Sequence, residues 1–431
     1  MKKRYVFLAF AITRMGGAQM YISNKIKYLR GLGWSTTVIS ALDGPIAIDS
    51  LNEFNDNIIF ELRFEPAMYS KGLIRRVVNR IKEIIGNADE AVIESLNSIC
   101  STWGEIIAKE INAKHISFLL DEKISIDKIY YDYFLFKLKR RELAFIKENS
   151  AVAFFNEIAI KNPPDYHYIL NAVCNNVVED IIDNRFDEIN YNVDYVLCSL
   201  GRLTKRYIKN AIDGISLFIE KNPNKKVTCV FIGDEIEDAK PSVKEYISEK
   251  IGRFKNVSLY TLGSVYPIPK SFLSHISVGI ASAGSANVLY RNNVPTISMD
   301  SNDGEAIGVM GYTTVNSLFR ENEPIIKLNV LLDLILNSNY LKEYTFVPSK
   351  TGSANKMLSE HIDFLNQSEP KKEYYRCFNL RYRSFNIRTR QILLNLIGTK
   401  NYIKMIYIRK RIIHSFSKIF ELQNNIKDKQ K

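Results

Sequence analysis

A run of small residues, Ser282-Ala-Gly-Ser-Ala-Asn287, stands directly after an apolar segment and leads into residues with helical spacing. Small side chains let a ligand approach the backbone closely, and the free N–H groups at the start of a helix attract a negative charge. The run therefore predicts a phosphate site. We expect the phosphate to be contacted by Ser282, Gly284, Ser285, Ala286 and Asn287.

A basic stretch follows another apolar segment, residues 194–200, and reads Gly201-Arg-Leu-Thr-Lys-Arg-Tyr-Ile-Lys209. A guanidinium group binds a diphosphate through two parallel hydrogen bonds, and a nearby ammonium group adds a compact positive charge. Arg202 and Lys205 are therefore predicted diphosphate ligands, with Lys209 as the alternative lysine. The competing interpretation is a basic helix start that only faces solvent.

Glycines also follow two other predicted strands, as Gly16-Gly17 near the N-terminus and as Gly233 after residues 227–232. Glycines at such places let the backbone turn sharply and present free N–H groups. The first pair lacks the Gly-x-Gly-x-x-Gly spacing of dinucleotide-binding folds, and no acidic residue follows where those folds bind the ribose. We expect all three glycines to line the diphosphate site, the alternative for the first pair being a tight turn without a ligand.

The composition predicts a globular protein with neither a metal centre nor a membrane span. The chain has 431 residues, 46% of them hydrophobic and 25% charged, which is enough for two or three domains with apolar cores. Its five cysteines show no paired spacing, which is typical of reduced thiols in a cytoplasmic protein. The apolar stretch 6–12 is followed by no cleavage site, and no run of about 18 apolar residues occurs, so we expect a first buried strand there and no targeting segment.

Apolar segments of strand length alternate with segments of helical spacing, which predicts an α/β fold with parallel sheets covered on both faces. The predicted strands are 5–11, 36–40, 91–94, 115–120, 151–155, 194–200, 227–232, 257–260, 276–281 and 296–299, and the predicted helices are 18–32, 102–111, 134–147, 208–220, 242–254, 286–291 and 325–337. We divide the chain into residues 1–190 and 191–365, two doubly wound, Rossmann-like domains, and a tail, 366–431. Open parallel sheets bind ligands at the carboxyl ends of their strands, so we expect the site in a cleft between the two domains.

Residues 371–431 carry the net positive charge: 16 basic and 3 acidic residues give +13, whereas the other 370 residues hold 43 basic and 44 acidic ones. Aromatic and aliphatic residues alternate with the bases, and we expect a helical extension that binds an anionic membrane surface. The predicted basic helix 134–147 is expected to contribute to this membrane contact. A solvated extension packed partly on the body and a nucleic-acid-binding segment use the same charges, although we expect no nucleic acid partner.

The order of three motifs, Gly-Gly-Ala after the first strand, Gly-Arg-Leu at 201–203 and Ile-Gly-Asp at 232–234, resembles the GT-B glycosyltransferases. The likeness is to the large group 1-like family that builds bacterial cell-surface polysaccharides, and it covers roughly residues 4–365. It implies that the first glycine loop opens the acceptor domain, while Arg202 and the following lysine grip a nucleotide diphosphate. GT-B enzymes generally use no divalent metal, so the resemblance implies neither metal nor cofactor beyond the nucleotide-sugar substrate.

The family's donor motif, in which one glutamate faces the sugar and another holds the ribose, is replaced here by Ala283-Gly-Ser-Ala-Asn-Val-Leu-Tyr290. The acid that faces the donor sugar must then lie elsewhere in the chain. We expect Glu305, or its neighbour Asp303, to contact the donor hydroxyls as a catalytic residue. A plain acidic turn is the alternative for this segment.

The family often places a histidine at the end of the fourth strand of its first domain, whereas this chain has His115 at the opposite end of that strand. Asp121 follows the cleft end and is the predicted catalytic group that polarises an acceptor hydroxyl. The alternative for Asp121 is an ordinary loop acid or a helix cap. Glu94 is a weaker candidate of the same kind, and His115 is expected to be structural.

Together these features predict a glycosyltransferase of the hexosyltransferase type, which moves a sugar from a nucleotide-sugar to a saccharide, lipid-linked or part of a cell-surface polysaccharide. We expect it in the cytoplasm, on the inner face of the cell membrane. Catalysis in such a site consists mainly of stabilising the departing diphosphate and aligning the acceptor. Two other functions fit the same motifs: a nucleotide-sugar epimerase of this fold, and a non-catalytic scaffold of polysaccharide assembly.

Overall fold

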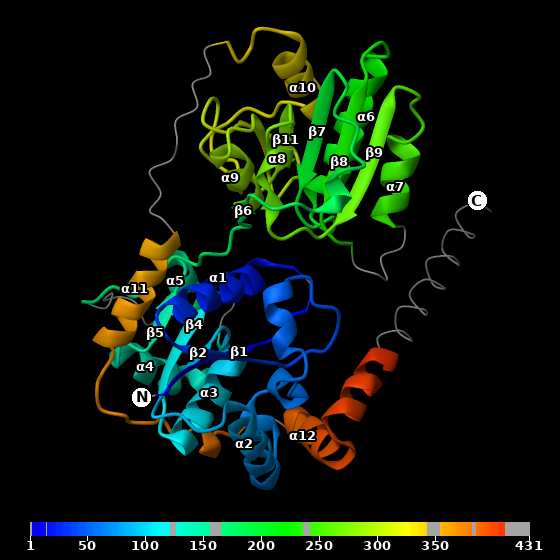
Figure 1. Ribbon diagram of the computed structural model, residues 1–431. Helices are drawn as coiled ribbons and strands as arrows, with labels where there is room; N and C mark the ends of the chain where they lie inside the picture. The colour runs from blue at the N-terminus through cyan, green and yellow to red at the C-terminus, as the bar shows by residue number, and fades with distance from the viewer. Residues whose placement is uncertain are drawn as a thin grey trace, which may run out of the picture.

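The computed structural model describes residues 2–13, 15–120, 126–155, 165–235, 242–342, 354–381 and 385–409. Two largely parallel sheets each form the centre of an α/β body, and the two bodies lie one above the other (Figure 1). The predicted class, α/β with two doubly wound sheets, is confirmed.

The first body is built on a five-stranded sheet in the order β2-β1-β3-β4-β5, with every neighbouring pair parallel. Its strands are β1 (Lys3–Ala9), β2 (Ser35–Ser40), β3 (Glu90–Ser95), β4 (Lys114–Leu119) and β5 (Leu143–Phe145), and its helices are α1 (Gly17–Gly31), α2 (Lys71–Ile85), α3 (Ser98–Ile111), α4 (Tyr131–Lys139) and α5 (Glu148–Phe154). Along β1, Val6 and Leu8 join the core beneath α2 and α3, whereas Tyr5 and Phe7 join the core beneath α1. Because both faces are covered, this strand is a continuous apolar run.

The second body has a six-stranded sheet in the order β13-β12-β11-β7-β8-β9, in which only the edge strand β13 is antiparallel to its neighbour. Its strands are β7 (Tyr195–Leu200), β8 (Val227–Ile232), β9 (Val257–Gly263), β11 (Val278–Ala281), β12 (Thr296–Met299) and β13 (Ala306–Val309), and its helices are α6 (Tyr207–Lys221), α7 (Val243–Lys250), α8 (Lys270–Leu273), α9 (Gly284–Arg291) and α10 (Leu328–Asn337). Helices α6, α7 and α10 cover one face and α8 and α9 the other. Strand β13 and helix α2 are not among the elements predicted from the sequence.

A connector, residues 165–194, runs from the first body to the second and is bonded to both. Its short strand β6 (Val178–Glu179) pairs in parallel with β10 (Ile268–Pro269). Asn24 of α1 donates to the Val173 carbonyl at 2.8 Å and accepts from the Tyr266 hydroxyl at 2.7 Å. These hydrogen bonds join α1, the connector and the second body at one point.

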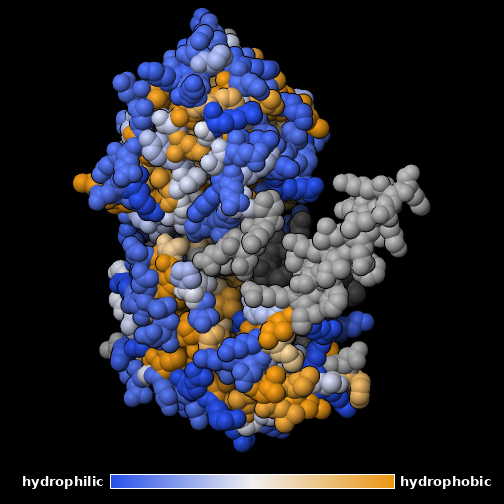
Figure 2. Space-filling view, turned by 90° about the vertical axis from the view of Figure 1, so that its right-hand side faces the viewer, coloured by the Kyte–Doolittle hydropathy of each residue, from blue (hydrophilic) through white to orange (hydrophobic). Residues whose placement is uncertain are grey.

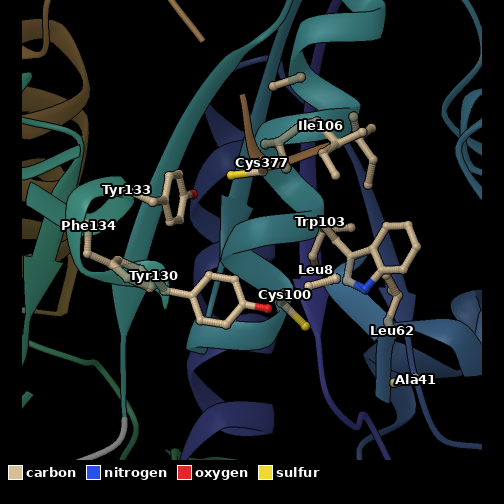
Figure 3. Close-up of a cluster of buried hydrophobic side chains, with 14 of the residues drawn as sticks. Leu8, Ala41, Leu62, Cys100, Trp103, Ile106, Tyr130, Tyr133, Phe134 and Cys377 are labelled. Atoms are coloured by element: carbon tan, nitrogen blue, oxygen red, sulfur yellow. The ribbon is translucent and has the colours of Figure 1, made fainter. Parts of the chain in front are cut away.

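After α10 the chain returns to the first body. Helix α11 (Ala354–Gln367) packs beside α1, where the buried His361 ring lies 3.2 Å from the Tyr21 hydroxyl and 3.3 Å from Lys25 Nζ. Further along, Cys377 belongs to the same buried cluster as Ile106 of α3 and Tyr133 of α4 (Figure 3). Residues 354–381 therefore form part of the core of the first body.

The expected helical extension is present as α12 (Phe385–Ile397) and the helical residues 399–409, and it is attached to the first body. Asn395 donates to the Met68 carbonyl at 3.1 Å and accepts from the Ser70 N–H at 2.8 Å, just before α2 begins. Tyr402 is buried against that body. No helix in the described ranges combines the length and the apolar character that crossing a bilayer requires.

The predicted helix 134–147 is correct only as far as Lys139, and the predicted strand 151–155 is wrong. Helix α4 ends at Lys139, Arg141 turns the chain with a φ of 56°, and β5 then adds an edge strand to the sheet. Residues 148–154 form the short helix α5. Apolar residues of α4, β5 and α5 all enter one core. The apolar spacing of this segment therefore mixes that of a helix with that of a strand, and it predicts neither element correctly.

The two basic residues of α4 differ in exposure, since Lys139 is exposed and Lys137 is not. Lys137 is fully buried and donates to Glu105 at 3.1 Å, to Glu142 at 2.7 Å and to the carbonyl of His115 at 2.7 Å. Two carboxylates satisfy this ammonium group inside the protein, where no membrane reaches it. The expected membrane contact of residues 134–147 therefore cannot involve Lys137, and for the exposed Lys139 and Lys147 it stays a prediction.

Candidate functional site

The strand order of the second sheet reverses between β7 and β11, because the chain builds β7, β8 and β9 outward and then returns to add β11 and β12 on the other side. Loops that leave two such strands diverge, and ligands of open α/β sheets bind in the crevice between them. The two loops here begin at Gly201 and at Ser282. The reversal thus brings together the two motifs that the sequence assigned to a diphosphate.

Distances around Gly201 show how closely the two loops approach each other. A Cβ atom on Gly201 would lie 3.5 Å from Lys205 Nζ and 3.6 Å from Ser285 Oγ, so these polar groups flank one backbone position. Gly233, which follows β8, packs on the same turn: its own Cβ would lie 2.0 Å from the Gly201 oxygen. Its φ of 150° also favours glycine. Gly233 is therefore needed to let the Gly201 turn approach β8.

Lys205 carries a positive charge that no carboxylate neutralises within the described part of the chain. Its Nζ atom donates to the Ser282 carbonyl at 3.2 Å. Burial, together with the nearby and exposed Arg202 guanidinium, lowers the pKa of Lys205 to about 8. Lys209, in contrast, is exposed and lies over the Tyr246 ring of α7. Of the two alternative lysines, Lys205 is the one that contacts the Ser282 loop.

Helix α9 begins with backbone groups that are available to an anion. The N–H groups of Gly284, Ser285 and Ala286 belong to its first turn, where a helix offers no internal acceptor. Ala283, just before them, has a φ of 58°, a conformation that costs an ordinary residue on the order of 1–3 kcal/mol and that clusters at ligand sites. Its N–H donates to the Ser317 carbonyl, which holds this strained turn in place.

Three residues of the small run hold neighbouring parts of the structure together. Ser282 Oγ lies 2.8 Å from Ser301 Oγ, and Asn287 Nδ2 donates to Ser317 Oγ at 3.3 Å. The Ala286 side chain is buried beneath α9. These three side chains shape the loop. The groups of the loop that face the Gly201 turn are therefore its backbone N–H groups and the Ser285 hydroxyl.

Glu305 and Asp303 lie in the turn between β12 and β13, and both carboxylates already have basic partners. Glu305 accepts from Lys327 at 2.9 Å and from Asn210 at 3.4 Å. Asp303 pairs with Arg320 at 2.5 Å. The structure therefore shows an acidic turn whose charges are balanced locally, on the α6 side of the Ser282 loop.

Of the acids assigned to the acceptor, Asp121 lies outside the described residues, and Glu94 is buried. The Glu94 carboxylate binds Lys25 at 2.5 Å and accepts from the hydroxyls of Tyr5 and Tyr21. Burial opposes its ionisation, but the ammonium group and the hydrogen bonds more than offset that effect and lower the pKa of Glu94. Glu94 therefore joins β3 to α1 inside the core and does not reach an acceptor.

His115 is buried, as expected for a structural residue. Its Nδ1 atom lies 2.8 Å from Glu105 Oε2 and its Nε2 atom 3.1 Å from Ser95 Oγ. Burial and the charge of Lys137 lower the pKa of His115 to about 4. The ring is thus neutral near pH 7 and connects β4 with α3 and β3.

The first sheet reverses its order between β1 and β3, and a hollow of about 350 Å³ opens at this point. Its walls come from the ends of β1, β3 and β4 and the starts of α1 and α3: Ala9, Phe10, Ala11, Ala18, Gln19, Leu96, Asn97, Ser98, Ile99 and Leu120. Most of these residues are apolar. The predicted glycine pair, Gly16 and Gly17, lies at the start of α1, directly before the lining residue Ala18, with Gly16 as the N-cap.

The connector lies between this helix start and that of α9. A Cβ atom on Gly17 would lie 3.4 Å from Cys174 Cβ, and one on Gly284 would lie 2.5 Å from Asn175 Oδ1. Cys174 and Asn175, which are neighbours in the connector, therefore lie against the start of α1 and the start of α9, respectively. The structure thus brings the predicted residues of the two bodies to a common region, with the connector between them.

Sequence reasoning missed three residues that shape the site. Asp300, at the end of β12, is buried and its carboxylate accepts three backbone N–H groups from the loops on either side. An acid directly after a buried strand was a signal for this role. Ser317 and Asn175 had no such signal, because they reach the Ser282 loop from distant parts of the chain.

No protein-family model and no curated protein sequence matches the chain. Among solved structures, it is similar to a glycosyltransferase from Rickettsia africae ESF-5, with a TM-score of 0.51 and 14% identity over 94% of this chain and 99% of that one. It is also similar to a UDP-GlcNAc 2-epimerase from Methanocaldococcus jannaschii (TM-score 0.42, 15% identity, 84% and 99% coverage) and to a UDP-forming trehalose-phosphate synthase from Burkholderia vietnamiensis (0.46, 11%, 84% and 96%). The likeness to the Rickettsia protein extends over nearly the whole of both chains and shows the GT-B architecture.

Proposed function

We propose that this protein is a glycosyltransferase, which transfers a sugar from a nucleotide-sugar to a saccharide acceptor and binds the donor diphosphate between the Gly201 turn and the start of α9. The observation that carries the proposal is the ammonium group of Lys205. It is partly buried, has no acidic partner among the described residues, and flanks Gly201 together with Ser285. Partial burial of a cation without a counter-ion is unfavourable, and an anionic ligand would supply the missing charge.

The proposed mechanism stabilises the leaving group. When the bond between sugar and diphosphate breaks, negative charge develops on the departing oxygen. Lys205, Arg202 and the first-turn N–H groups of α9 would neutralise that charge, and the Ser282 carbonyl holds the ammonium group in place before the ligand arrives. Because Lys205 and Arg202 supply two positive charges and the helix start adds N–H groups, the proposal includes no metal ion and no cofactor.

Two carboxylates complete the mechanism. Asp121 would polarise the attacking hydroxyl of the acceptor, and Glu305 would contact hydroxyls of the donor sugar. For Glu305 this contact requires the carboxylate to exchange part of its bonding to Lys327 and Asn210 when the donor binds. A Glu305→Gln substitution keeps the shape and removes the charge, so it is expected to raise KM for the donor without lowering thermal stability.

The acceptor is proposed to bind at the hollow of the first body, and to be a saccharide that is lipid-linked or part of a cell-surface polysaccharide. The hollow lies at the strand reversal of its sheet, and its apolar walls suit the C–H faces of sugar rings or a lipid chain. The proposed location is the cytoplasm at the inner face of the membrane, with residues 371–431 near anionic lipids and no nucleic acid partner.

Nucleotide binding tests the donor site. We expect one of UDP, GDP, CDP and ADP to raise the melting temperature of the full chain, and isothermal titration calorimetry to give its Kd. Lys205→Ala and Arg202→Ala each remove a charged contact and are expected to weaken binding about tenfold to a hundredfold. Lys209→Ala removes the same kind of charge four residues later, in the first turn of α6, and serves as the matched control. If no nucleotide binds, or if Lys209→Ala weakens binding as much as Lys205→Ala, the site is not the one proposed.

Product analysis separates transfer from the two other functions that fit the same motifs. A transferase forms nucleoside diphosphate and a glycosylated product that requires the acceptor. An epimerase converts the nucleotide-sugar without any acceptor, since the same diphosphate site serves that reaction. A scaffold binds the nucleotide and forms neither product.

A further inference from the structure

We infer that α2, α12 and the helical residues 399–409 together form a surface that binds anionic membrane lipids. The exposed bases of α2 supply charge for the lipid phosphates, and exposed apolar side chains of the C-terminal helices enter the boundary between headgroups and acyl chains. We call these three elements the basal surface. The inference builds on the proposed function in one respect, that a lipid-linked acceptor would be reached from such a surface.

Exposed apolar side chains are concentrated on the C-terminal helices. Phe385 is 81% exposed, Leu396 76% and Ile392 60%. The same helices also expose Leu393, Ile397, Met405, Tyr407 and Ile408. On the face shown in Figure 2, hydrophobic side chains gather on the lower body beside hydrophilic ones. Several large apolar side chains that lie near one another in water mark a surface that binds a partner or a membrane.

Helix α2 contributes a basic face. Its apolar residues are buried in the core of the first body, while its five bases point outward: Lys71, Arg75, Arg76, Arg80 and Lys82. Glu83 is the one acid of this helix. Of these bases, Arg80 alone pairs with a carboxylate among the described residues, and its 3.8 Å contact with Glu61 is long.

Contacts between the elements make them one surface. Lys71 Nζ lies 5.6 Å, and the Arg75 guanidinium 5.8 Å, from the centre of the Phe378 ring, which precedes α12. The Ser70 N–H donates to Asn395 of α12 at the start of α2, and Figure 1 shows α2 and α12 side by side. The C-terminal helices add further exposed bases: Arg388, Arg390, Lys400, Lys404 and Arg409.

The charge on the C-terminal side is not balanced by acids in its own segment. The sequence contains no aspartate or glutamate between Glu373 and Glu421. The basal surface is therefore cationic and apolar at once. Attraction to an anionic bilayer adds roughly fivefold in partitioning for each base near the membrane, and interfacial helices bury their apolar residues a short way into the bilayer.

An anionic bilayer accounts for both the positive charge and the apolar side chains of the basal surface, whereas a nucleic acid or a second copy of the chain accounts for only one of these properties. A nucleic acid would use the bases and leave aliphatic residues such as Ile392 and Leu396 in water. A second copy of the chain could cover the apolar residues, but it would bring two positively charged surfaces together. We therefore choose the membrane as the occupant and treat the other two as outcomes of the test.

Vesicle flotation with the full-length protein tests the inference, using phosphatidylcholine vesicles with and without phosphatidylglycerol. We expect binding only to the anionic vesicles. Arg75→Glu with Arg76→Glu removes two cations, so it should lower the partition coefficient at least about 25-fold. Leu396→Asp removes an inserted side chain and should lower it about tenfold or more.

Matched controls change the same chemistry elsewhere. Lys244→Glu with Lys255→Glu reverses two exposed lysines of the second body, and Ile182→Asp changes a side chain that is 90% exposed in the connector. These variants are expected to bind vesicles like the wild type. Circular dichroism and nucleotide affinity of every variant show whether its fold and its second body are intact.

Four results would overturn the inference. The first two are equal binding of the protein to neutral and anionic vesicles, and unchanged vesicle binding of the α2 variant. The third is that the protein binds duplex RNA and not vesicles. The fourth is that the protein forms a dimer that Leu396→Asp dissociates and does not bind vesicles. Because the nucleotide site lies in the other body, lost vesicle binding with intact nucleotide binding rejects the basal surface alone. Intact vesicle binding without nucleotide binding rejects the proposed function alone.

Discussion

Diphosphate binding should depend on pH through Lys205. Its pKa is about 8 in the free protein, because burial and Arg202 disfavour its charged form. A bound diphosphate favours the charged form and should return the pKa towards its ordinary value of about 10.4. The charged form of the lysine, which binds the ligand, therefore predominates below pH 8 and is lost as the pH rises through 8.

The size of the effect follows from these two pKa values. At pH 7 about nine tenths of the free protein carries the charged lysine, and at pH 9 about one tenth does. The Kd should therefore rise about tenfold between pH 7 and pH 9, a free-energy difference of about 1.4 kcal/mol. Binding at pH 8 should take up about half a proton, since half of the free lysines are neutral there.

Isothermal titration calorimetry measures both quantities, the Kd at each pH and the proton uptake from the dependence of the enthalpy on the buffer. Lys205→Arg keeps a cation that does not titrate in this range, so the difference between the two proteins removes any contribution from the nucleotide itself. Lys209→Arg should retain the full pH dependence. Identical pH profiles for wild type and Lys205→Arg, with no proton uptake at pH 8, would refute the assignment of Lys205 to the diphosphate.

Other substitutions probe the support of the site. Gly233→Ala is expected to cost about 1–3 kcal/mol in chemical denaturation, because its Cβ would meet backbone at 2.0 Å, whereas Gly31→Ala has open space and should cost little. Lys25→Met leaves the buried Glu94 carboxylate without its cation and should lower the free energy of unfolding by about 3–5 kcal/mol. Lys3→Met breaks an exposed ion pair and should lower it by at most about 1 kcal/mol. Equal losses of stability in the two variants would contradict the buried network. Chelation of divalent metals with EDTA should leave nucleotide affinity unchanged, and a loss that Mg²⁺ restores would show that a metal completes the site.

The elements that position the site follow from local sequence patterns. Strands β8 and β12 have the bounds that the apolar runs predicted, 227–232 and 296–299, and the loops after β7 and β11 begin where the small and basic motifs stand. In a parallel sheet, the carboxyl ends of such strands lie at one edge, so neighbouring loops meet there. The choice between Lys205 and Lys209 could not be made from the sequence, because it depends on the Ser282 carbonyl, far away in the chain.

Long-range burial explains what the sequence patterns did not predict. The bases around Lys137 have the spacing of an exposed helical face, yet Glu105 of α3 and Glu142 before β5 draw this lysine into the core. Residues 354–381 likewise follow the second body in sequence but pack on the first, where the Tyr375 N–H donates to Glu105. A pattern within one segment shows which residues are apolar or charged, and it does not show which distant group will satisfy them.

Charge is distributed unequally around the Gly201 turn. Asp303 and Glu305 of the β12–β13 turn each have a basic partner, and the Asp234 carboxylate next to Gly233 accepts from the N–H and the hydroxyl of Ser264. Lys205 and Arg202, in contrast, have no acidic partner in the described ranges. Bases without an acidic partner attract an anion. A reaction in which negative charge moves towards those bases would be accelerated there, and the departure of a diphosphate from a sugar is such a reaction. The same two bases can therefore account for both donor binding and the transfer step of the proposed enzyme.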